Sequence, residues 1–108
     1  MYELSIETVR KLCSDGKIKW TKHATRRLQE RLIFRDDVFN AINNGKIIEQ
    51  YPDSFPNPSC LISGKALNEK PLHIVVSADG VILTVITAYE PSLDKFEGDF
   101  ETRKESQQ

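Results

Sequence analysis

The spacing of apolar residues changes along this chain, from a helical period near the N-terminus to an alternating period from about residue 46 onward. The helical part predicts three helices, which we place at Ser5–Ser14, Thr21–Leu32 and Arg35–Asn43. In the second helix the apolar stripe is Ala24, Leu28 and Leu32, each four residues from the next. Gly16 and Gly45 follow the first and third helices, where glycine commonly ends a helix.

The alternating part predicts four strands joined by short connections. We place them at Lys46–Tyr51, Ser59–Leu67, Leu72–Ala78 and Val81–Tyr89. Asp79-Gly80 between the last two is a strong hairpin signal. Lys17–Trp20, before the second helix, is expected to be a short extended link. This order predicts a two-layer α+β domain, with N-terminal helices packed on a four-stranded, mainly antiparallel sheet.

Length and composition narrow the class of protein. The 108 residues suit a single domain, which we place at residues 1–100, followed by a polar tail at 101–108 that we expect to be disordered. No apolar run approaches the roughly 20 residues of a membrane span, and Met1–Leu4 lacks the pattern of a signal peptide. We therefore expect a cytoplasmic protein with no membrane partner. Cys13 and Cys60 lie far apart without CxxC spacing, so we expect buried free thiols, no metal site and no cofactor.

The formal net charge of -1 conceals an uneven distribution of charge. Seven basic residues lie between positions 17 and 35, namely Lys17, Lys19, Lys22, Arg26, Arg27, Arg31 and Arg35. Glu30 is the one acid in that stretch, whereas acids outnumber bases from Glu90 to the end. A local basic patch can bind phosphate even when the total charge is near zero. The alternative is a solvated helix face paired with the acidic tail, and composition alone does not separate the two.

The second helix carries a candidate site. His23, Arg27 and Arg31 stand at i, i+4 and i+8, so they form one row beside the apolar stripe. Histidine transfers protons near neutral pH, and arginine holds two phosphate oxygens with a fixed positive charge. Cleavage of RNA by its own 2′-OH needs such a base or acid and such a cation. The alternative is that His23 is simply a residue at a helix boundary.

The last two strands add a second group of candidates. Thr87 and Tyr89 lie two apart and share a face, where Tyr89 can bind phosphate or stack on a base. His73 points to the face opposite Leu72 and Ile74. Tyr89 can equally be a half-buried aromatic at a sheet edge. For His73, cross-strand packing is the alternative that we slightly favour over catalysis. We expect Trp20 and Tyr51 to be core or rim residues rather than stacking platforms.

Residues 23–31, HATRRLQER, resemble the HAxxRMxxR signature of a bacterial domain family of unknown function. Leu28 stands in place of the usual methionine, which is a conservative core change, and Arg26 is an extra basic residue. Further similar segments are Leu72–Val76 and Ile86–Pro91, and the resemblance extends from about Trp20 to Asp99. That family is similar to the RelE, BrnT and MqsR ribonuclease toxins.

The resemblance implies a RelE-like fold and a metal-independent endoribonuclease that acts on RNA, mRNA in particular, as the toxin half of a toxin–antitoxin pair. It also implies a small zinc-finger antitoxin of the YgiT or MqsA type as partner. In this interpretation the catalytic residues are His23, Arg27, Arg31 and Tyr89, and the residues that bind substrate are Lys22, Arg26, Thr87 and His73. The rival hypothesis is a non-catalytic module that binds nucleic acid or an acidic protein through the same basic helix face. A metal-dependent DNA nuclease is a third and weaker hypothesis, because Asp36 and Asp37 are better explained as helix-start charges.

Overall fold

The structure, a computed structural model, describes residues 3–92 and residue 101. The elements in this part of the chain are α1 (Ile6–Ser14), β1 (Ile18–Trp20), α2 (Lys22–Glu30), α3 (Arg35–Asn44), β2 (Lys46–Tyr51), β3 (Ser59–Lys65), β4 (Pro71–Ala78) and β5 (Leu83–Tyr89). The mixed α+β class with N-terminal helices is therefore confirmed. The prediction of four strands is wrong, because the described part of the chain forms a five-stranded sheet.

The sheet has the strand order β1-β5-β4-β3-β2. Strands β2 to β5 form the antiparallel meander that the short connections predicted. The segment predicted as an extended link is β1, which pairs in parallel with β5 so that Ile18 lies opposite Leu83 and Trp20 opposite Val85. Leu83 N–H donates to the carbonyl of Lys17 at 2.9 Å at the start of this pairing. Three residues are too few to show an alternating pattern, and the partner strand is distant in sequence.

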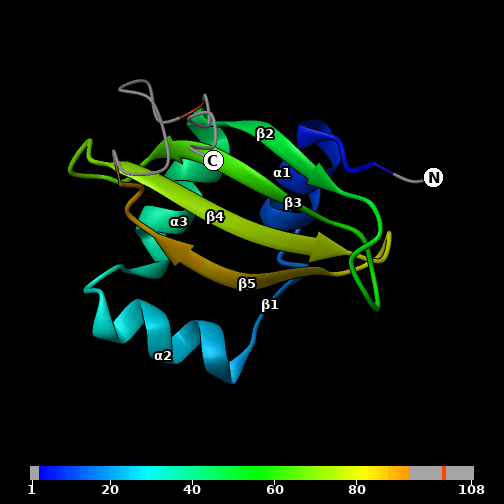
Figure 1. Cartoon of the computed structure of the whole chain (residues 1–108), viewed down its shortest axis with the longest axis horizontal. Coiled ribbons are helices and arrows are strands. Elements are labelled where there is room, and N and C mark those ends of the chain that lie inside the picture. The colour runs from blue at the N-terminus through cyan, green and yellow to red at the C-terminus, as the bar shows by residue number, and fades with distance from the viewer. Residues whose placement is uncertain (1–2, 93–100, 102–108) are drawn as a thin grey trace, which may run out of the picture.

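The helices and the sheet enclose one apolar cluster. Figure 1 shows α1 and α3 behind the sheet, and α2 alongside β5. Fully buried side chains from both layers meet there, including Val9, Val38, Ile42, Ile62, Ile74 and Val85. Gly64 allows α3 to approach β3 closely, because a Cβ atom on Gly64 would lie 2.2 Å from the carbonyl oxygen of Ala41. The sheet therefore holds α3 by direct backbone contact as well as by side chains.

The end of α2 differs from the prediction. The helix ends at Glu30, and Leu32 adopts a positive φ of 57°. Leu32 N–H donates to Gln29 O at 3.3 Å, and Ile33 N–H donates to Leu28 O at 2.9 Å, which is the hydrogen-bond pattern of a Schellman helix end. This turn buries Ile33 and leaves Leu32 80% exposed. The expected core row is therefore right for Ala24 and Leu28 and wrong for Leu32.

Three further expectations concern the C-terminal tail, membrane-spanning segments and the two cysteines. Of the tail at 101–108, Glu101 alone belongs to the described residues. Its carboxylate forms a salt bridge with Lys46 Nζ at 2.8 Å. Within the described residues, no helix combines the length and the apolar composition needed to cross a bilayer. Cys13 and Cys60 are free thiols, as expected; Cys60 is buried and Cys13 partly so.

Candidate functional site on α2 and β5

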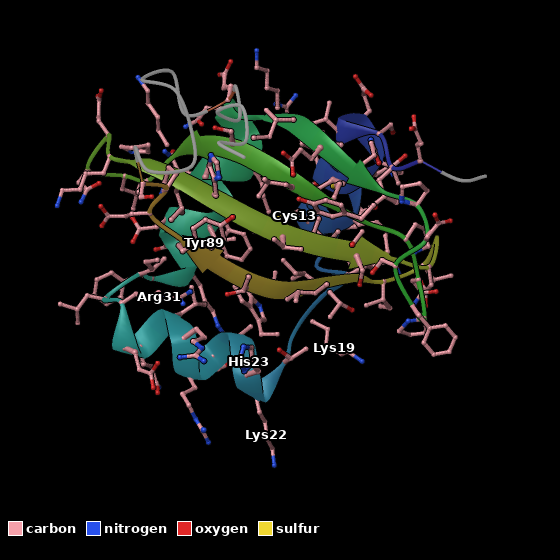
Figure 2. All side chains as sticks on the ribbon, in the orientation of Figure 1. Cys13, Lys19, Lys22, His23, Arg31 and Tyr89 are labelled. Carbon is pink, nitrogen blue, oxygen red and sulfur yellow. The ribbon has the colours of Figure 1, made fainter. Side chains whose placement is uncertain are left out.

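The sequence sets α2 with one side against β5 and the other side in solvent. Thr21 caps the helix, because its Oγ1 accepts the Ala24 N–H at 2.9 Å. Ala24 and Leu28 are buried, so the polar side of the helix faces outward. Lys22, His23 and Arg26 are exposed there, and Figure 2 shows Lys22 extending away from the sheet. The predicted basic surface is therefore present on α2.

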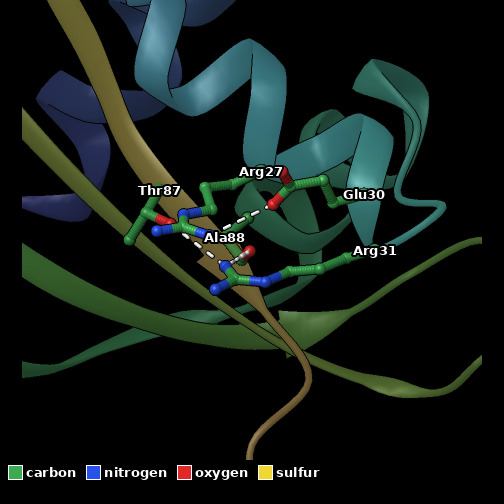
Figure 3. Close-up of polar contacts among 5 residues, drawn as sticks. All are labelled: Arg27, Glu30, Arg31, Thr87 and Ala88. Atoms are coloured by element: carbon green, nitrogen blue, oxygen red, sulfur yellow. Dashed lines mark hydrogen bonds and ion pairs between the residues drawn. The ribbon is translucent and has the colours of Figure 1, made fainter.

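Arg31 connects α2 with the last strand. Its Nη1 donates to the carbonyl of Ala88 at 2.8 Å and to Thr87 Oγ1 at 3.3 Å (Figure 3). The helix row and the end of β5, which the sequence left as two separate groups, thus meet at this residue. Both bonds use Nη1, so within the described part of the chain Nε and Nη2 of Arg31 are available to another acceptor.

Arg27 is paired within the helix. Its Nη1 lies 3.1 Å from Glu30 Oε1, and the two side chains are 43% and 51% exposed (Figure 3). Glu30 thereby offsets part of the repulsion within the cationic row. An ion pair this exposed stabilises the helix only slightly, by about 0.3–0.5 kcal/mol for pairs with helical spacing. A phosphate group can therefore compete with Glu30 for Arg27.

Tyr89 and His73 are neighbours across β4 and β5. The two residues are directly paired in the sheet, and their ring centroids lie 5.7 Å apart in an edge arrangement. His73 is fully buried, which agrees with the packing alternative, whereas Tyr89 is half-buried and accessible at the end of its strand. The register places Thr87 on the same face as Tyr89, because they oppose Val75 and His73. A role for His73 in binding substrate stays a prediction.

The structure adds one aromatic contact that the sequence analysis missed. The Arg35 guanidinium lies over the Trp20 ring at 4.8 Å, and Trp20 meets Phe39 edge-on at 5.7 Å. Trp20 is partly buried, as expected of a rim residue. No periodic pattern links Arg35 with Trp20, because they belong to different elements that only the fold brings together. This contact ties the start of α3 to the residue that precedes the cap of α2.

Two hollows in the described part of the chain lie away from α2. One, of about 730 Å³, lies between the end of α3 and the β3–β4 turn, and its lining includes Asn40, Asn44 and Leu67. The other, of about 390 Å³, lies between the start of α1 and β2. Neither includes a residue of the predicted site. Among the described residues, no group of three or more His, Cys, Asp or Glu side chains is arranged to hold a metal ion.

The fold and this surface define a small α+β domain that presents a basic helix beside the end of a β-strand. Comparison with protein families matches residues 20–90 to the family described as a domain of unknown function, DUF4258. The match covers more than half of the chain, so the protein belongs to this family. The matched segment contains α2, β5 and every residue of the predicted site. No curated protein and no solved structure matches the chain.

The family match agrees with the expectation of an uncharacterised domain family. It begins at Trp20 and therefore leaves out α1, which the sequence analysis also found outside the resemblance. Membership of this family assigns no reaction, substrate or partner. Any function has to be argued from the residues themselves.

Proposed function

We propose that this protein is a metal-independent endoribonuclease of the RelE-like toxin type, which cleaves mRNA on the surface formed by α2 and the end of β5. One observation carries the proposal: Arg31 bonds to Thr87 and Ala88, so the row of His23, Arg27 and Arg31 shares one surface with the Thr87–Tyr89 strand end. The cations on the exposed side of α2 supply the attraction for a phosphate backbone.

In this proposal His23 is the general base or the general acid, and as the base it takes the proton of the RNA 2′-OH. The O2′ atom then attacks the adjacent phosphorus, and the bond from phosphorus to the 5′-oxygen breaks. The departing 5′-oxygen takes a proton from solvent water or, where His23 is the acid, from the imidazolium, which leaves a 2′,3′-cyclic phosphate and a 5′-OH. Arg27, together with the Nε and Nη2 groups of Arg31, neutralises the added charge on the phosphate oxygens. Tyr89 and Thr87 orient the phosphate or the 2′-OH, and Lys22 and Arg26 hold the flanking backbone. His73, whose ring meets that of Tyr89 edge-on, holds the Tyr89 ring in position.

Partner and fold type belong to the same proposal. A zinc-finger antitoxin of the YgiT or MqsA type would neutralise the protein, in keeping with the toxin resemblance. The RelE-like assignment is consistent with helices packed on an antiparallel meander, to which β1 adds a parallel edge strand.

The test is digestion of RNA in EDTA by wild type, His23→Ala and Gln29→Ala. Gln29 is an exposed residue of α2 outside the proposed site, so it controls for general damage to the helix. We expect wild type and Gln29→Ala to cut the RNA. We expect His23→Ala to cut it at least roughly a hundredfold more slowly, as is typical when a general base is removed. Intact RNA with wild type, or equal cutting by His23→Ala, would overturn the proposal.

A second candidate function is a binding module without turnover. The observation in its favour is that Arg27 and Arg31 both already serve partners within the fold, Glu30 for one and β5 for the other. In that case RNA binds but stays intact. Arg27→Ala and Lys22→Ala then weaken binding evenly across RNA sequences, and affinity falls steeply with salt concentration. Binding and cleavage measured on the same RNA separate the two functions.

A further inference from the structure

An exposed aromatic ring lies in the turn that follows Arg31. Two phenylalanine rings are exposed in the described part of the chain, Phe34 at 69% and Phe55 at 93%. Figure 1 shows the turn between α2 and α3, which holds Phe34, at the same end of the molecule as the arrowhead of β5. The loop between β2 and β3, which holds Phe55, lies at the other end. Phe34 is therefore the exposed ring at the end of the molecule that carries the candidate site.

The backbone keeps Phe34 close to Arg31. The two residues are three positions apart, so the chain between them spans at most about 11 Å. The Schellman turn bends the chain here, because Ile33 N–H donates to Leu28 O at 2.9 Å. Arg31 is in turn bonded to Ala88 O at 2.8 Å. The ring thus adjoins the place where α2 meets the end of β5.

The Phe34 ring contributes little to the fold. It belongs to the N-cap residue of α3, where a serine, threonine or aspartate side chain normally accepts a backbone N–H, and phenylalanine has no acceptor. Within the described residues, no aromatic ring and no guanidinium group lies against it, since the Arg35 guanidinium covers Trp20 instead. The faces of the ring are therefore open to a ligand.

The mixed charges around the ring favour an uncharged ligand group. Glu30 is paired with Arg27, and the Asp37 carboxylate accepts the Phe34 N–H at 2.9 Å, so both carboxylates act within the protein. Asp36 is exposed two residues after Phe34. Its charge repels a phosphate or an acidic side chain, whereas it does not repel a flat, neutral base.

The proposed reaction supplies such a group. Attack of the 2′-OH on phosphorus requires the O2′ atom, the phosphorus and the 5′-oxygen to lie nearly in line. A regularly stacked strand does not hold these three atoms in line, so the nucleotides on the two sides of the scissile bond must be splayed apart. Bases that are unstacked in this way commonly stack on aromatic side chains of the protein.

We propose that Phe34 is the stacking platform for an unpaired base of RNA, next to the phosphate that Arg31 holds. The inference rests on the proposed function, because it requires RNA on the surface formed by α2 and the end of β5. It requires no cleavage, so it applies equally to the binding module. A phenylalanine contacts the flat face of a base and not its edges, so Phe34 adds affinity and position rather than a sequence preference.

The test measures how tightly a short single-stranded RNA binds in EDTA, by fluorescence anisotropy of an end-labelled strand. Its 2′-OH groups are methylated, so that the strand cannot be cut. We expect Phe34→Ala to bind this RNA roughly tenfold more weakly than wild type. Phe34→Leu should be weakened to a similar degree, because leucine is apolar but offers no flat stacking surface. Phe34→Trp should bind as tightly as wild type.

Three controls accompany these variants. Phe55→Ala removes the other exposed ring and should leave the RNA affinity unchanged. The thermal midpoint of each Phe34 variant should match that of wild type, because the ring is exposed and its side chain makes no cap bond. A stacked base carries no charge, so Phe34→Ala should keep the salt dependence of wild type, whereas Arg27→Ala should reduce it.

An abasic strand of the same length and charge identifies the base as the group that Phe34 contacts. We expect wild type and Phe34→Ala to bind this strand equally, although they differ roughly tenfold on the strand with bases. This comparison is a double-mutant cycle between the ring and the bases. It does not depend on the register in which the RNA binds.

Several results would overturn the inference. Equal RNA binding by wild type and Phe34→Ala does so while weaker binding by Arg27→Ala still supports RNA on α2. Full affinity in Phe34→Leu, or a tenfold loss by Phe34→Ala on the abasic strand as well, shows that no base stacks on the ring. Dimerisation of wild type that Phe34→Ala abolishes, measured by sedimentation, makes a second copy the occupant.

The outcomes also separate this inference from the proposed function. If wild type binds no RNA, methylated or unmodified, both fail. If the Phe34 variants show the expected losses of binding while wild type leaves unmodified RNA intact, stacking on Phe34 stands and the proposed cleavage fails.

Discussion

Arg31 is the residue on which the candidate site depends. The row pattern predicted a phosphate-binding role, and the structure adds a structural one, because Arg31 bonds to the carbonyl of Ala88 and to Thr87 Oγ1. These two roles are compatible, since the guanidinium has five N–H donors and its described bonds use one nitrogen. Arg31 is thus a positioning residue for β5 as well as a candidate phosphate ligand.

Replacing Arg31 separates these roles. Arg31→Ala removes a charged hydrogen bond to a backbone carbonyl, so we expect it to lower the free energy of unfolding by about 1 kcal/mol in urea titration, given the exposure of the side chain. Arg26→Ala is the matched control, because Arg26 is an exposed arginine on the same helix. We expect it to change stability by less than about 0.5 kcal/mol. Equal stability of the Arg31→Ala variant and wild type would contradict the positioning role.

Because its two cysteine thiols are shielded from water, we expect the protein to lose free energy of unfolding at alkaline pH. Burial raises the pKa of the Cys60 thiol to about 12, and burial also raises the pKa of Cys13 above its ordinary value of 9.0. Above pH 9 the unfolded chain releases thiol protons that the folded chain retains, so stability falls as the pH rises from about 9 toward 12. Cys60→Ala should be less stable than wild type at neutral pH, because it leaves a cavity, but its decline as the pH rises from about 9 toward 12 should be shallower. Parallel declines in urea titrations of the two proteins would contradict this assignment.

At the scale of elements, the sequence predicted what local patterns control. The three helices, the Thr21 cap and the antiparallel meander follow from apolar spacing and turn residues. The strand β1 escaped prediction because three residues show no alternation and its partner β5 is far away in sequence. Leu32 was misplaced because the helical period continues through it, whereas the backbone turns one residue earlier and gives the core position to Ile33.

The candidate site was predictable to a similar degree. Spacing alone placed His23, Arg27 and Arg31 on one row, and the two-residue spacing of Thr87 and Tyr89 placed them on one face of a strand. The meeting of the two groups through Arg31 and Ala88 depends on how α2 docks on β5, and the stacking of Arg35 on Trp20 depends on where the fold places α3. Such contacts between distant segments leave no periodic trace in a single sequence.

The packing of α3 on β3 gives a prediction at this scale. A Cβ atom at Gly64 would lie 2.2 Å from Ala41 O, so Gly64→Ala forces the helix and strand apart. We expect a loss of about 1–3 kcal/mol in the free energy of unfolding, the range for overpacked cores. Gly16→Ala is the control, since a Cβ there meets nothing within 4 Å and only the positive φ of 74° is strained. It should cost about 1 kcal/mol. A loss from Gly64→Ala no larger than that from Gly16→Ala would contradict the close approach.

At the scale of the whole molecule, α2 is attached along one side of β5, and the sheet and the other two helices form the main body of the described fold (Figure 1). This arrangement leaves the basic side of α2 exposed. In the proposal above, this side of α2 binds the phosphate backbone of RNA.

The measurement that tests the central claim most directly is the chemistry of the RNA ends after incubation in EDTA. Attack by the 2′-OH leaves a 2′,3′-cyclic phosphate on one product and a 5′-OH on the other, which mass spectrometry identifies. We predict these ends with wild type and with Gln29→Ala, and their loss with His23→Ala. Products with 3′-OH ends, RNA that stays intact with wild type, or cyclic phosphate that forms equally with His23→Ala would contradict the account.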